Sequence, residues 1–452
     1  MTAIGTGGPL LLTGAELIDG TGAPVKERSW IHIDDGRIVA LGQGSAPAVL
    51  GAATHDLRGR TVLPGLSDMH VHLGPAPRAK WMLAQLIAHG VTRIKEAGNT
   101  LGNLAGARRW LAEGPVAPKV FVSGVTLNGS EREERFLLAG RVTAQLLENN
   151  WAFGVEFLKV HNWISTRAFD QIAAFAAEKD IYLTGHVPLS MTSVAAIDRG
   201  MTILEHIRLH PGEAHTDPAL VSRYPMDLKV MRRTAHWAFF DPQNDAIRRT
   251  LDAWEARKDR MFVDPTIVVQ EAIAYADRLD TIDGFGRDGL SDDLQAQAAK
   301  DAKDYSADLG PAEFADARGS VAGMIAFTGL AHARGIRVLT GTDTEGPLVV
   351  AGASLLHELE HFVTAGLSPV EAIHASTGVA SEALRDPERG VLRAGARADL
   401  VVARGAVAKD IKALREIELV ILDGRMHLRA DLLAAAAALA GDVRPAVAPP
   451  DE

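Results

Sequence analysis

The sequence contains no cysteine among its 452 residues. This absence excludes disulfide bridges, zinc sites built from thiolates and a cysteine nucleophile. Any metal site in the chain must therefore take its ligands from histidine, aspartate, glutamate and lysine side chains. Side chains of these types favour borderline or hard divalent cations over soft ones.

The chain also lacks long apolar runs and an excess of positive charge. No segment is long and apolar enough to span a bilayer, and the first twenty residues lack the basic lead of a secretory signal. We therefore expect a cytoplasmic protein with no membrane partner. The formal net charge of −10 argues against a nucleic-acid partner, because binding a phosphate backbone requires a concentrated basic surface.

The overall composition is typical of a soluble globular enzyme. Hydrophobic residues make up 47% of the chain and charged residues 23%, both of which are ordinary values for such proteins. A chain of 452 residues is too long for one small core. Its length fits a large catalytic domain with a smaller companion domain.

Both ends of the chain are rich in strand patterns. Residues 30–40 contain two alternating runs separated by Asp35-Gly36, which is a hairpin-turn signal. Matching runs lie at 398–403 and 418–425. Because chain termini usually lie at the surface, we predict that residues 1–62 and 390–440 form one composite β-sandwich domain. Residues 441–452 are expected to be a disordered tail.

Between the two ends, short apolar strands alternate with helical stretches. The predicted strands are 62–70, 91–96, 119–123, 156–161, 181–186, 202–206, 261–269 and 336–343. Eight strands with helix-rich connections predict an α/β fold, a (β/α)8 TIM barrel over residues 63–389. The long connections at 207–260 and 270–335 follow strands six and seven. We expect them to form walls or lids on the catalytic face.

Metal-binding residue types stand at the ends of several predicted strands. His70 and His72 lie two apart in a strand, so both imidazoles project from one face. Later strand ends carry Lys159, His186, His206 and Asp343. Each of these residues is weak evidence alone. A barrel gathers its strand ends at one mouth, so together they predict a metal centre there.

Lys159 differs from the others because an ammonium group cannot bind a metal ion. Burial among apolar neighbours lowers the pKa of an amine, and the neutral amine can add carbon dioxide to become a carbamate. A carbamate has two oxygens and can bridge two cations. The alternative interpretation is a lysine that is ion-paired to an acid such as Glu96 or Glu156.

At this point a family resemblance can be stated. The stretches VLPGLSDMHVHLG, HGVTRIKEAGN, EFLKVH, GHVP with TILEHI, VDPTIV, GTDTEG, HELEHFVTAGLSPVEAIHASTGVASEAL and GVLRAGARADLVVA resemble the metal-dependent amidohydrolase superfamily. The resembling branch contains imidazolonepropionase-like hydrolases, carbamylated-lysine prolidases (dipeptidases) and ochratoxinase-like enzymes. The resemblance runs from residue 9 to about 425. The stretch at 404–407 departs from it, because the family often has Asn-Pro-Leu where this chain reads Arg-Gly-Ala-Val.

The resemblance implies a binuclear metal centre. One divalent ion, with zinc expected ahead of cobalt or manganese, would be held by His70, His72 and Asp343. The second would be held by His186 and His206. Carbamylated Lys159 and a hydroxide would bridge the two ions, and that hydroxide would attack the scissile carbonyl. Asp343 would accept its proton and pass it to the leaving amine.

The resemblance is much less specific for the substrate. The branch favours a small amide that bears a carboxylate, such as a dipeptide, an N-acyl amino acid or an ochratoxin-type amide. Basic and aromatic residues on the walls could hold the carboxylate; the candidates are His161, Arg132, Arg135, Tyr224 and His236. His161 is favoured because it lies two residues after Lys159 on the same strand face. Relatives commonly assemble into homo-oligomers, so we expect one here.

Four other interpretations remain open. The same centre would suit a lactonase or phosphotriesterase, because all three reactions attack a polarised centre with hydroxide. A mononuclear deaminase is disfavoured, because no glutamate stands three residues after His186 or His206. A scaffold protein that has lost its metals is disfavoured, because all six positions that the resemblance assigns to metal ligands carry the expected residues. His357-Glu-Leu-Glu-His361 matches a zincin motif, but its helix would lie in the outer ring, away from the strand ends.

Overall fold

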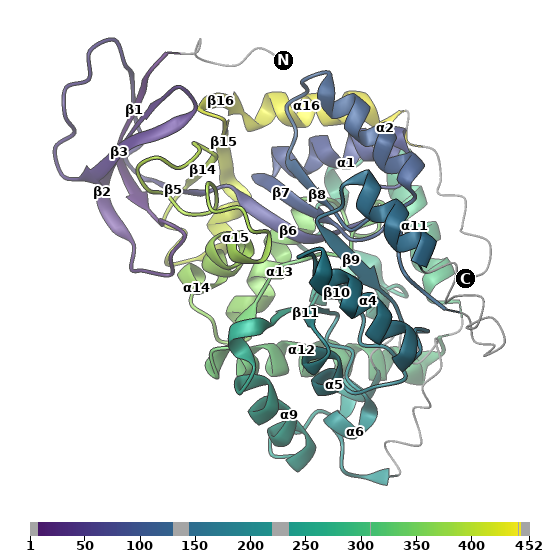
Figure 1. The fold of residues 1–452 in the computed structure, drawn as a ribbon. Coiled ribbons are helices and arrows are strands. Elements are labelled where there is room, and N and C mark those ends of the chain that lie inside the picture. Colours follow the sequence, from purple (N-terminus) through teal and green to yellow (C-terminus); the bar gives the residue numbers. More distant parts are fainter. Residues whose placement is uncertain (1–7, 130–143, 219–234, 308, 442, 444–452) are drawn as a thin grey trace.

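Strands from both ends of the chain pair in one sheet. The computed structural model describes residues 8–129, 144–218, 235–307, 309–441 and 443. The sheet contains β1 (Leu10–Leu17), β2 (Lys26–Asp34), β3 (Arg37–Gln43), β4 (Ala53–Asp56), β5 (Arg60–Pro64), β14 (Leu400–Arg404), β15 (Ile417–Leu422) and β16 (Arg425–Leu428). Its order is β16-β15-β14-β5-β1-β2-β3, with β4 beside β1. In Figure 1 this sheet lies at one side of the molecule, with purple N-terminal strands beside yellow-green C-terminal ones.

The two chain ends meet where β14 runs antiparallel to β5, with Leu400 opposite Pro64. The Asp35-Gly36 turn joins β2 to β3, and both of its residues have positive φ, as a two-residue hairpin requires. The predicted pairing of the chain ends is therefore present. The described strands form one hydrogen-bonded sheet, and its organisation as a two-layered sandwich stays a prediction.

The central part of the chain contains two parallel sheets. One has three strands, β6 (Leu66–Val71), β7 (Val91–Glu96) and β8 (Lys119–Val122). The other has five, in the order β13-β12-β11-β10-β9: β9 (Phe157–Val160), β10 (Tyr182–Gly185), β11 (Met201–Glu205), β12 (Phe262–Asp264) and β13 (Arg337–Val338). The predicted α/β fold with parallel strands is thus confirmed, and each predicted strand overlaps an observed one.

Several predicted strand boundaries were wrong. The predicted strand 62–70 is divided at Gly65, so that β5 belongs to the terminal sheet and β6 to the parallel sheet. The predicted strand 261–269 ends after Asp264, because Thr266 adopts a left-handed conformation (φ 46°) and a helix begins at Ile267. Apolar runs alone do not distinguish a buried strand from a buried helix.

Helices connect the strands and cover them. They are α1 (Ala76–Ala88), α2 (Leu101–Ala112), α4 (Thr166–Glu178), α5 (Ser193–Asp198), α6 (Pro211–Ala214), α9 (Asp245–Glu255), α10 (Ile267–Ala274), α11 (Asp292–Tyr305), α12 (Pro311–Ala333), α13 (Ala353–Thr364), α14 (Pro369–His374), α15 (Ala380–Ala383) and α16 (Arg429–Ala440). Thr100, Ser165 and Thr192 cap α2, α4 and α5, each accepting a hydrogen bond from the amide three residues on. The described parts of the two long connections, expected to be walls, are largely helical.

Backbone hydrogen bonds also connect the edges of the two parallel sheets. Between β8 and β9, Glu156 N donates to Val122 O at 3.0 Å and Leu127 N to Lys159 O at 2.8 Å. Between β6 and the segment after β13, three further bonds form: Met69 N to Thr340 O at 2.9 Å, Asp343 N to His70 O at 2.8 Å and His72 N to Thr344 O at 2.8 Å. These bonds hold the carboxyl ends of strands from both sheets close together.

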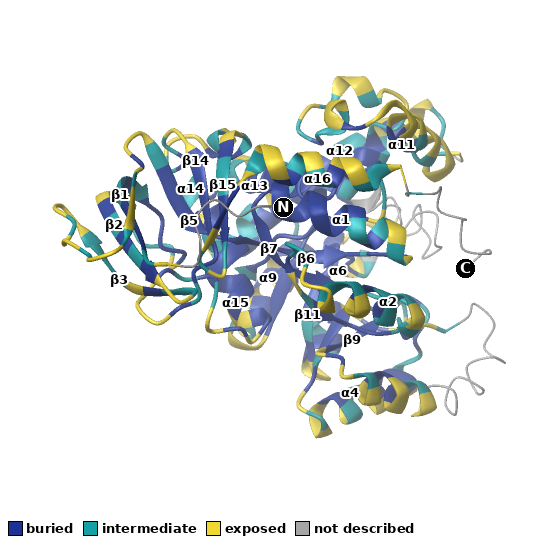
Figure 2. Ribbon diagram, turned by 90° about the horizontal axis from the view of Figure 1, so that it is seen from above, coloured by how far each residue is buried: buried dark blue, intermediate teal, exposed yellow. Residues whose placement is uncertain are grey.

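Buried residues lie on the parallel strands and on the helix faces turned toward them, and exposed residues lie on the outer helix faces (Figure 2). The C-terminal helix α16 packs against α1, as expected for a short alanine-rich helix. The predicted disordered tail, 441–452, lies outside the described residues except for Gly441 and Val443. Among the described helices, none has the length and apolar character needed to cross a bilayer.

Gly65 offers a test of the junction between the terminal sheet and β6. A Cβ atom on Gly65 would lie 2.2 Å from Oγ1 of buried Thr92. We therefore expect Gly65→Ala to lower the free energy of unfolding by about 1–3 kcal/mol through overpacking. Denaturant unfolding of the purified protein would measure it. The double variant Gly65→Ala/Thr92→Ala should recover part of the loss, because it removes the nearest atoms.

Gly289 is the matched control, since no heavy atom of the described residues lies within 4 Å of its added Cβ position. Gly289→Ala should unfold at the same denaturant concentration as the unsubstituted protein. An equal loss in both variants would mean that the close approach to Thr92 is unimportant.

Candidate metal centre

Three of the predicted metal ligands lie at mutual contact distance. His70 and His72 come from the end of β6, and Asp343 follows β13. His70 Nε2 lies 3.3 Å from His72 Nε2, and each lies 3.3 Å from Asp343 Oδ1. Ligands placed ~2.0–2.1 Å from a tetrahedral zinc ion are separated by about 3.3 Å. The three donor atoms are therefore spaced as ligands of one ion would be.

His186 and His206 lie beside this group. Their ring centroids are 4.7 Å apart, and the His206 ring is 4.6 Å from that of His70. His206 Nδ1 is 3.9 Å from the second carboxylate oxygen of Asp343. The structure thus brings together residues from β6, β10, β11 and the segment after β13. One possible metal-binding group consists of His70, His206 and Asp343, and another consists of His186, Glu205 and His206.

Contacts behind the histidines orient their rings. The Nδ1 atoms of three of them face an oxygen: Gly98 O at 3.0 Å for His72, Asn162 Oδ1 at 2.7 Å for His186 and Thr266 Oγ1 at 2.6 Å for His206. The carbonyl oxygen of Gly98 can only accept, so it favours the tautomer of His72 with the proton on Nδ1 and leaves Nε2 as the ligand atom. Burial lowers the pKa of His70, His186 and His206 well below the usual value, which favours the neutral, metal-binding form.

His72 and Asp343 form the accessible side of the group. Their side chains are 25% and 24% exposed, whereas those of His70 and His206 are fully or almost fully buried. Burial alone would lower the pKa of His72, but its contact with Asp343 raises it. Solvent therefore reaches the group on the side of His72 and Asp343.

Left-handed backbone conformations place two of these side chains. His206 has φ 63° and Asp343 has φ 56°, values that are uncommon for residues other than glycine and that concentrate at functional sites. Successive strand residues normally face opposite sides of a sheet. The left-handed turn at His206 breaks this alternation, so both Glu205 and His206 reach the same group of residues.

Lys159 is buried and ion-paired to Glu205. Its Nζ atom also lies 3.3 Å from His70 Nε2. The acid partners suggested by the sequence, Glu96 and Glu156, were wrong: they accept hydrogen bonds from the backbone amides of Gly98 and Val122. Neither lies on β11, the strand that carries Glu205.

Glu205 is the main residue that the sequence interpretation missed. Its other oxygen accepts hydrogen bonds from Lys95 Nζ at 2.7 Å and Thr184 Oγ1 at 2.8 Å, and all three side chains are buried. Burial alone would raise the pKa of Glu205, but the charges of Lys159 and Lys95 lower it well below the usual range. Its position directly before a strand-end histidine was the available signal.

Two buried aspartates beside the histidines were also missed. Asp68 accepts a hydrogen bond from Thr342 Oγ1 at 2.7 Å, and burial raises its pKa to about 7. Asp264, at the end of β12, lies 3.8 Å from His70 Nδ1. Neither of its carboxylate oxygens has a hydrogen-bond partner among the described residues. Such an unpaired buried group requires an explanation, and a nearby cation would provide one.

The predicted substrate contacts are only partly visible. His161 stacks on His186 with ring centroids 3.9 Å apart, so it does lie beside the metal-binding side chains. Arg132, Arg135 and Tyr224 lie outside the described residues, as does the side chain of His236.

Thr266 allows a test of the ring orientation. Thr266→Val removes the oxygen that faces His206 Nδ1 while keeping the size of the side chain. Loss of such a contact typically lowers metal affinity or activity 10–100-fold, and we expect a reduction of that order in metal retained after dialysis against a chelator. Thr266→Ser keeps the hydroxyl and should retain the metal. Similar losses in both variants would point to backbone strain instead.

Comparison with known proteins identifies a family and a fold. A model of the amidohydrolase family matches residues 61–427. Among solved structures, a bottromycin amidohydrolase is similar with a TM-score of 0.70 at 23% identity, covering 95% of this chain and 90% of that one. A Xaa-Pro dipeptidase with bound methionine has a TM-score of 0.66 at 19% identity (93% and 100% covered). The A. niger ochratoxinase has a TM-score of 0.64 at 18% identity (93% and 96% covered).

A curated relative matches a short stretch. The adenine deaminase of Methanoculleus marisnigri is 36% identical over 76 residues, which is 17% of this chain and 14% of that protein. The chain therefore matches only about a seventh of that relative's length.

Proposed function

The chain belongs to the amidohydrolase family, whose members are metal-dependent hydrolases, and on that premise we propose that it hydrolyses an amide bond of a small substrate bearing a carboxylate. Dipeptides, N-acyl amino acids and ochratoxin-type amides are the substrate class. The observation that carries the proposal is the 3.3 Å spacing of donor atoms of His70, His72 and Asp343. Similarity to a dipeptidase and an ochratoxinase supports the choice of an amide.

The residues of the group suit two divalent ions. His70, His72 and Asp343 would hold one, and His186 and His206 the other. When bound, the ions supply a nucleophile from water near neutral pH and polarise the scissile carbonyl. Zinc is the proposed ion, because the donors are imidazole nitrogens and carboxylate oxygens.

The charges around Glu205 support a carbamate on Lys159. Glu205 faces two buried lysines, Lys95 and Lys159, so one carboxylate is shared by two ammonium groups when both are charged. Burial lowers the pKa of Lys159 despite its contact with Glu205. Loss of a proton from Lys159 leaves Lys95 and Glu205 as a neutral pair; addition of carbon dioxide to the neutral amine then releases one more proton and gives a carbamate with one negative charge, which the divalent ions would balance. The carbamate oxygens would then provide further metal ligands.

Asp343 is proposed to move the proton. One carboxylate oxygen contacts His70 and His72, while the other is 3.9 Å from His206. The side chain is partly exposed, so it borders the space from which the substrate approaches. It can therefore accept a proton as water is activated and deliver it to the leaving amine. His161, stacked on His186, is proposed to contact the substrate, as are Arg132, Arg135, Tyr224 and His236.

We also propose that the parallel strands form one closed (β/α)8 barrel over residues 63–389. The backbone bonds at both sheet edges support this closure. Residues 1–62 and 390–440 would form the companion domain, which has a separate cluster of buried apolar side chains. Homo-oligomerisation and a cytoplasmic location remain predictions from the sequence.

A substrate panel tests the proposed reaction. We expect the zinc-loaded enzyme to hydrolyse acyl-proline or acyl-phenylalanine substrates, measured by release of the amino acid. Asp343→Asn should lose more turnover than metal, because it removes the proton acceptor and keeps one side-chain oxygen, and this loss of turnover excludes contaminating activity. Exclusive turnover of lactones or paraoxon-type esters would overturn the amide assignment and favour the alternative hydrolase class.

Lys159 tests the carbamate. Lys159→Ala should lose most metal and activity, and bicarbonate or short carboxylic acids should partly restore turnover by replacing the missing oxygens. Labelling with 13C-bicarbonate should give a carbamate signal in the unsubstituted protein and none in Lys159→Ala. Unchanged metal content in Lys159→Ala would remove the carbamate from the proposal.

A further inference from the structure

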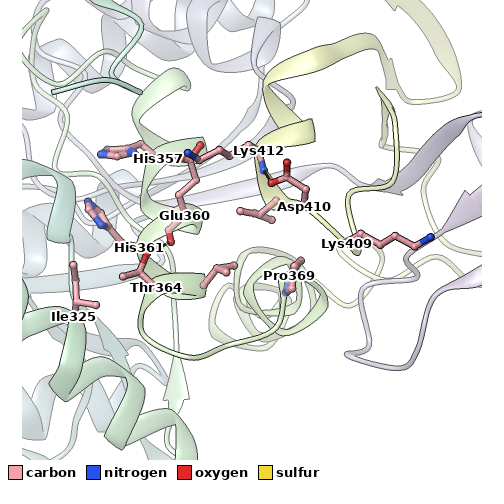
Figure 3. Close-up of a pocket in the computed structure, with 11 residues that line it drawn as sticks. Ile325, His357, Glu360, His361, Thr364, Pro369, Lys409, Asp410 and Lys412 are labelled. Atoms are coloured by element: carbon pink, nitrogen blue, oxygen red, sulfur yellow. Dashed lines mark hydrogen bonds and ion pairs between the residues drawn. The ribbon is translucent and has the colours of Figure 1, made fainter.

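A second group of metal-binding side chains lies between α10 and α13, outside the strand-end group. It consists of Glu271 on α10 with His357 and His361 on α13. Glu271 Oε2 lies 2.7 Å from His357 Nε2 and 3.1 Å from His361 Nε2. Residues four apart on a helix lie on the same side, and Figure 3 shows both rings projecting from the same side of α13. Three potential ligand atoms therefore converge on one point.

The group is accessible from solvent. A pocket of about 470 Å³ is lined by both histidines and by Glu360, Thr364 and Asp410, among others (Figure 3). The side chains of Glu271 and His357 are 13% exposed and that of His361 is 9% exposed. Both histidines therefore border the pocket, and each of the three side chains keeps a small exposed fraction.

A carboxylate stands behind His357. The Nδ1 atom of His357 lies 3.5 Å from Glu360 Oε2. It has no hydrogen-bond partner among the described residues. Arg415 holds Glu360 in place with two bonds, from Nε at 2.7 Å and from Nη2 at 2.9 Å. Histidines that bind a metal through Nε2 commonly direct Nδ1–H at such a carboxylate. The surroundings of His357 thus match those of a metal ligand.

We propose that Glu271, His357 and His361 form a second transition-metal site, separate from the strand-end centre. Two imidazoles, one carboxylate and a water are a ligand set that zinc accepts in tetrahedral geometry. Donors around zinc are separated by about 3.3 Å, so Glu271 Oε2 needs to move only about 0.6 Å or less from each histidine nitrogen.

The site connects α10 to α13 close to the strand-end group. Glu358, which lies between the two histidines in sequence, accepts hydrogen bonds from the amides of Ile267 and Val268 at 2.9 Å each. These amides begin α10, directly after Thr266, the residue that faces His206 Nδ1. An ion bound by Glu271, His357 and His361 would therefore fix the helix that follows Thr266.

Without an ion, the same side chains form an ion pair. Burial opposes a charged His357, but its contacts with Glu271 and Glu360 raise its pKa to about 9. Contacts with the two histidines lower the pKa of Glu271 to about 2, although burial opposes this. A metal ion would take the place of the proton on His357. The competing interpretation is an ion pair that binds no metal.

Zinc content distinguishes the two interpretations. The full-length protein and His361→Gln would be loaded with zinc, freed of excess by gel filtration and analysed by elemental mass spectrometry. We expect His361→Gln to contain one equivalent less than the unsubstituted protein. His332→Gln is the control, because His332 is a partly exposed histidine on neighbouring α12 whose side chain forms an ion pair with Glu371; its zinc content should be unchanged.

The comparison does not depend on the strand-end centre, because it measures a difference that is independent of how many ions that centre holds. Equal zinc content in His361→Gln and the unsubstituted protein would overturn the proposal. If His361→Gln fails to fold, anomalous diffraction at the zinc edge from crystals of the unsubstituted protein decides the question. A peak between Glu271, His357 and His361 is expected, and its absence would leave the ion pair as the correct interpretation.

Discussion

The contact on which the candidate centre depends is the one between Glu205 and two buried lysines. Lys95 and Lys159 approach the same carboxylate from β7 and β9, and Glu205 itself comes from β11. Burying charges is costly unless they are paired, so each of the three groups is acceptable only because the others are present. This arrangement holds the Lys159 nitrogen beside His70 while leaving Lys95 to neutralise Glu205 if Lys159 loses its charge.

The histidines show how a rigid framework prepares a metal centre. His72, His186 and His206 each have one ring nitrogen facing an oxygen from a different segment of the chain, so their remaining nitrogens are directed inward. Such preorganisation reduces the entropy lost when an ion binds. The partly exposed His72 and Asp343 lie on the side open to solvent, whereas His70 and His206 are buried.

The helices behind the strands are part of the same arrangement. Helix α10 begins directly after Thr266, and α13 holds its first amides through Glu358. The histidines that flank Glu358 contact Glu271 further along α10. The motif at 357–361 was correctly expected on a helix away from the strand ends. Its pairing with Glu271, about 90 residues earlier in the chain, could not be read from the motif.

Local patterns in the sequence were sufficient to predict the alternation of strands and helices, the pairing of the chain ends, the family, and the strand-end positions of His70, His72, Lys159, His186, His206 and Asp343. These features depend on side-chain periodicity and on short motifs, which a linear chain displays directly. Only the tertiary structure decided the partner of Lys159, the turn that brings Glu205 and His206 to the same side, and the group formed by Glu271 with two distant histidines. Those contacts join segments far apart in the chain or rest on backbone conformations that break strand alternation, and no local pattern specifies either.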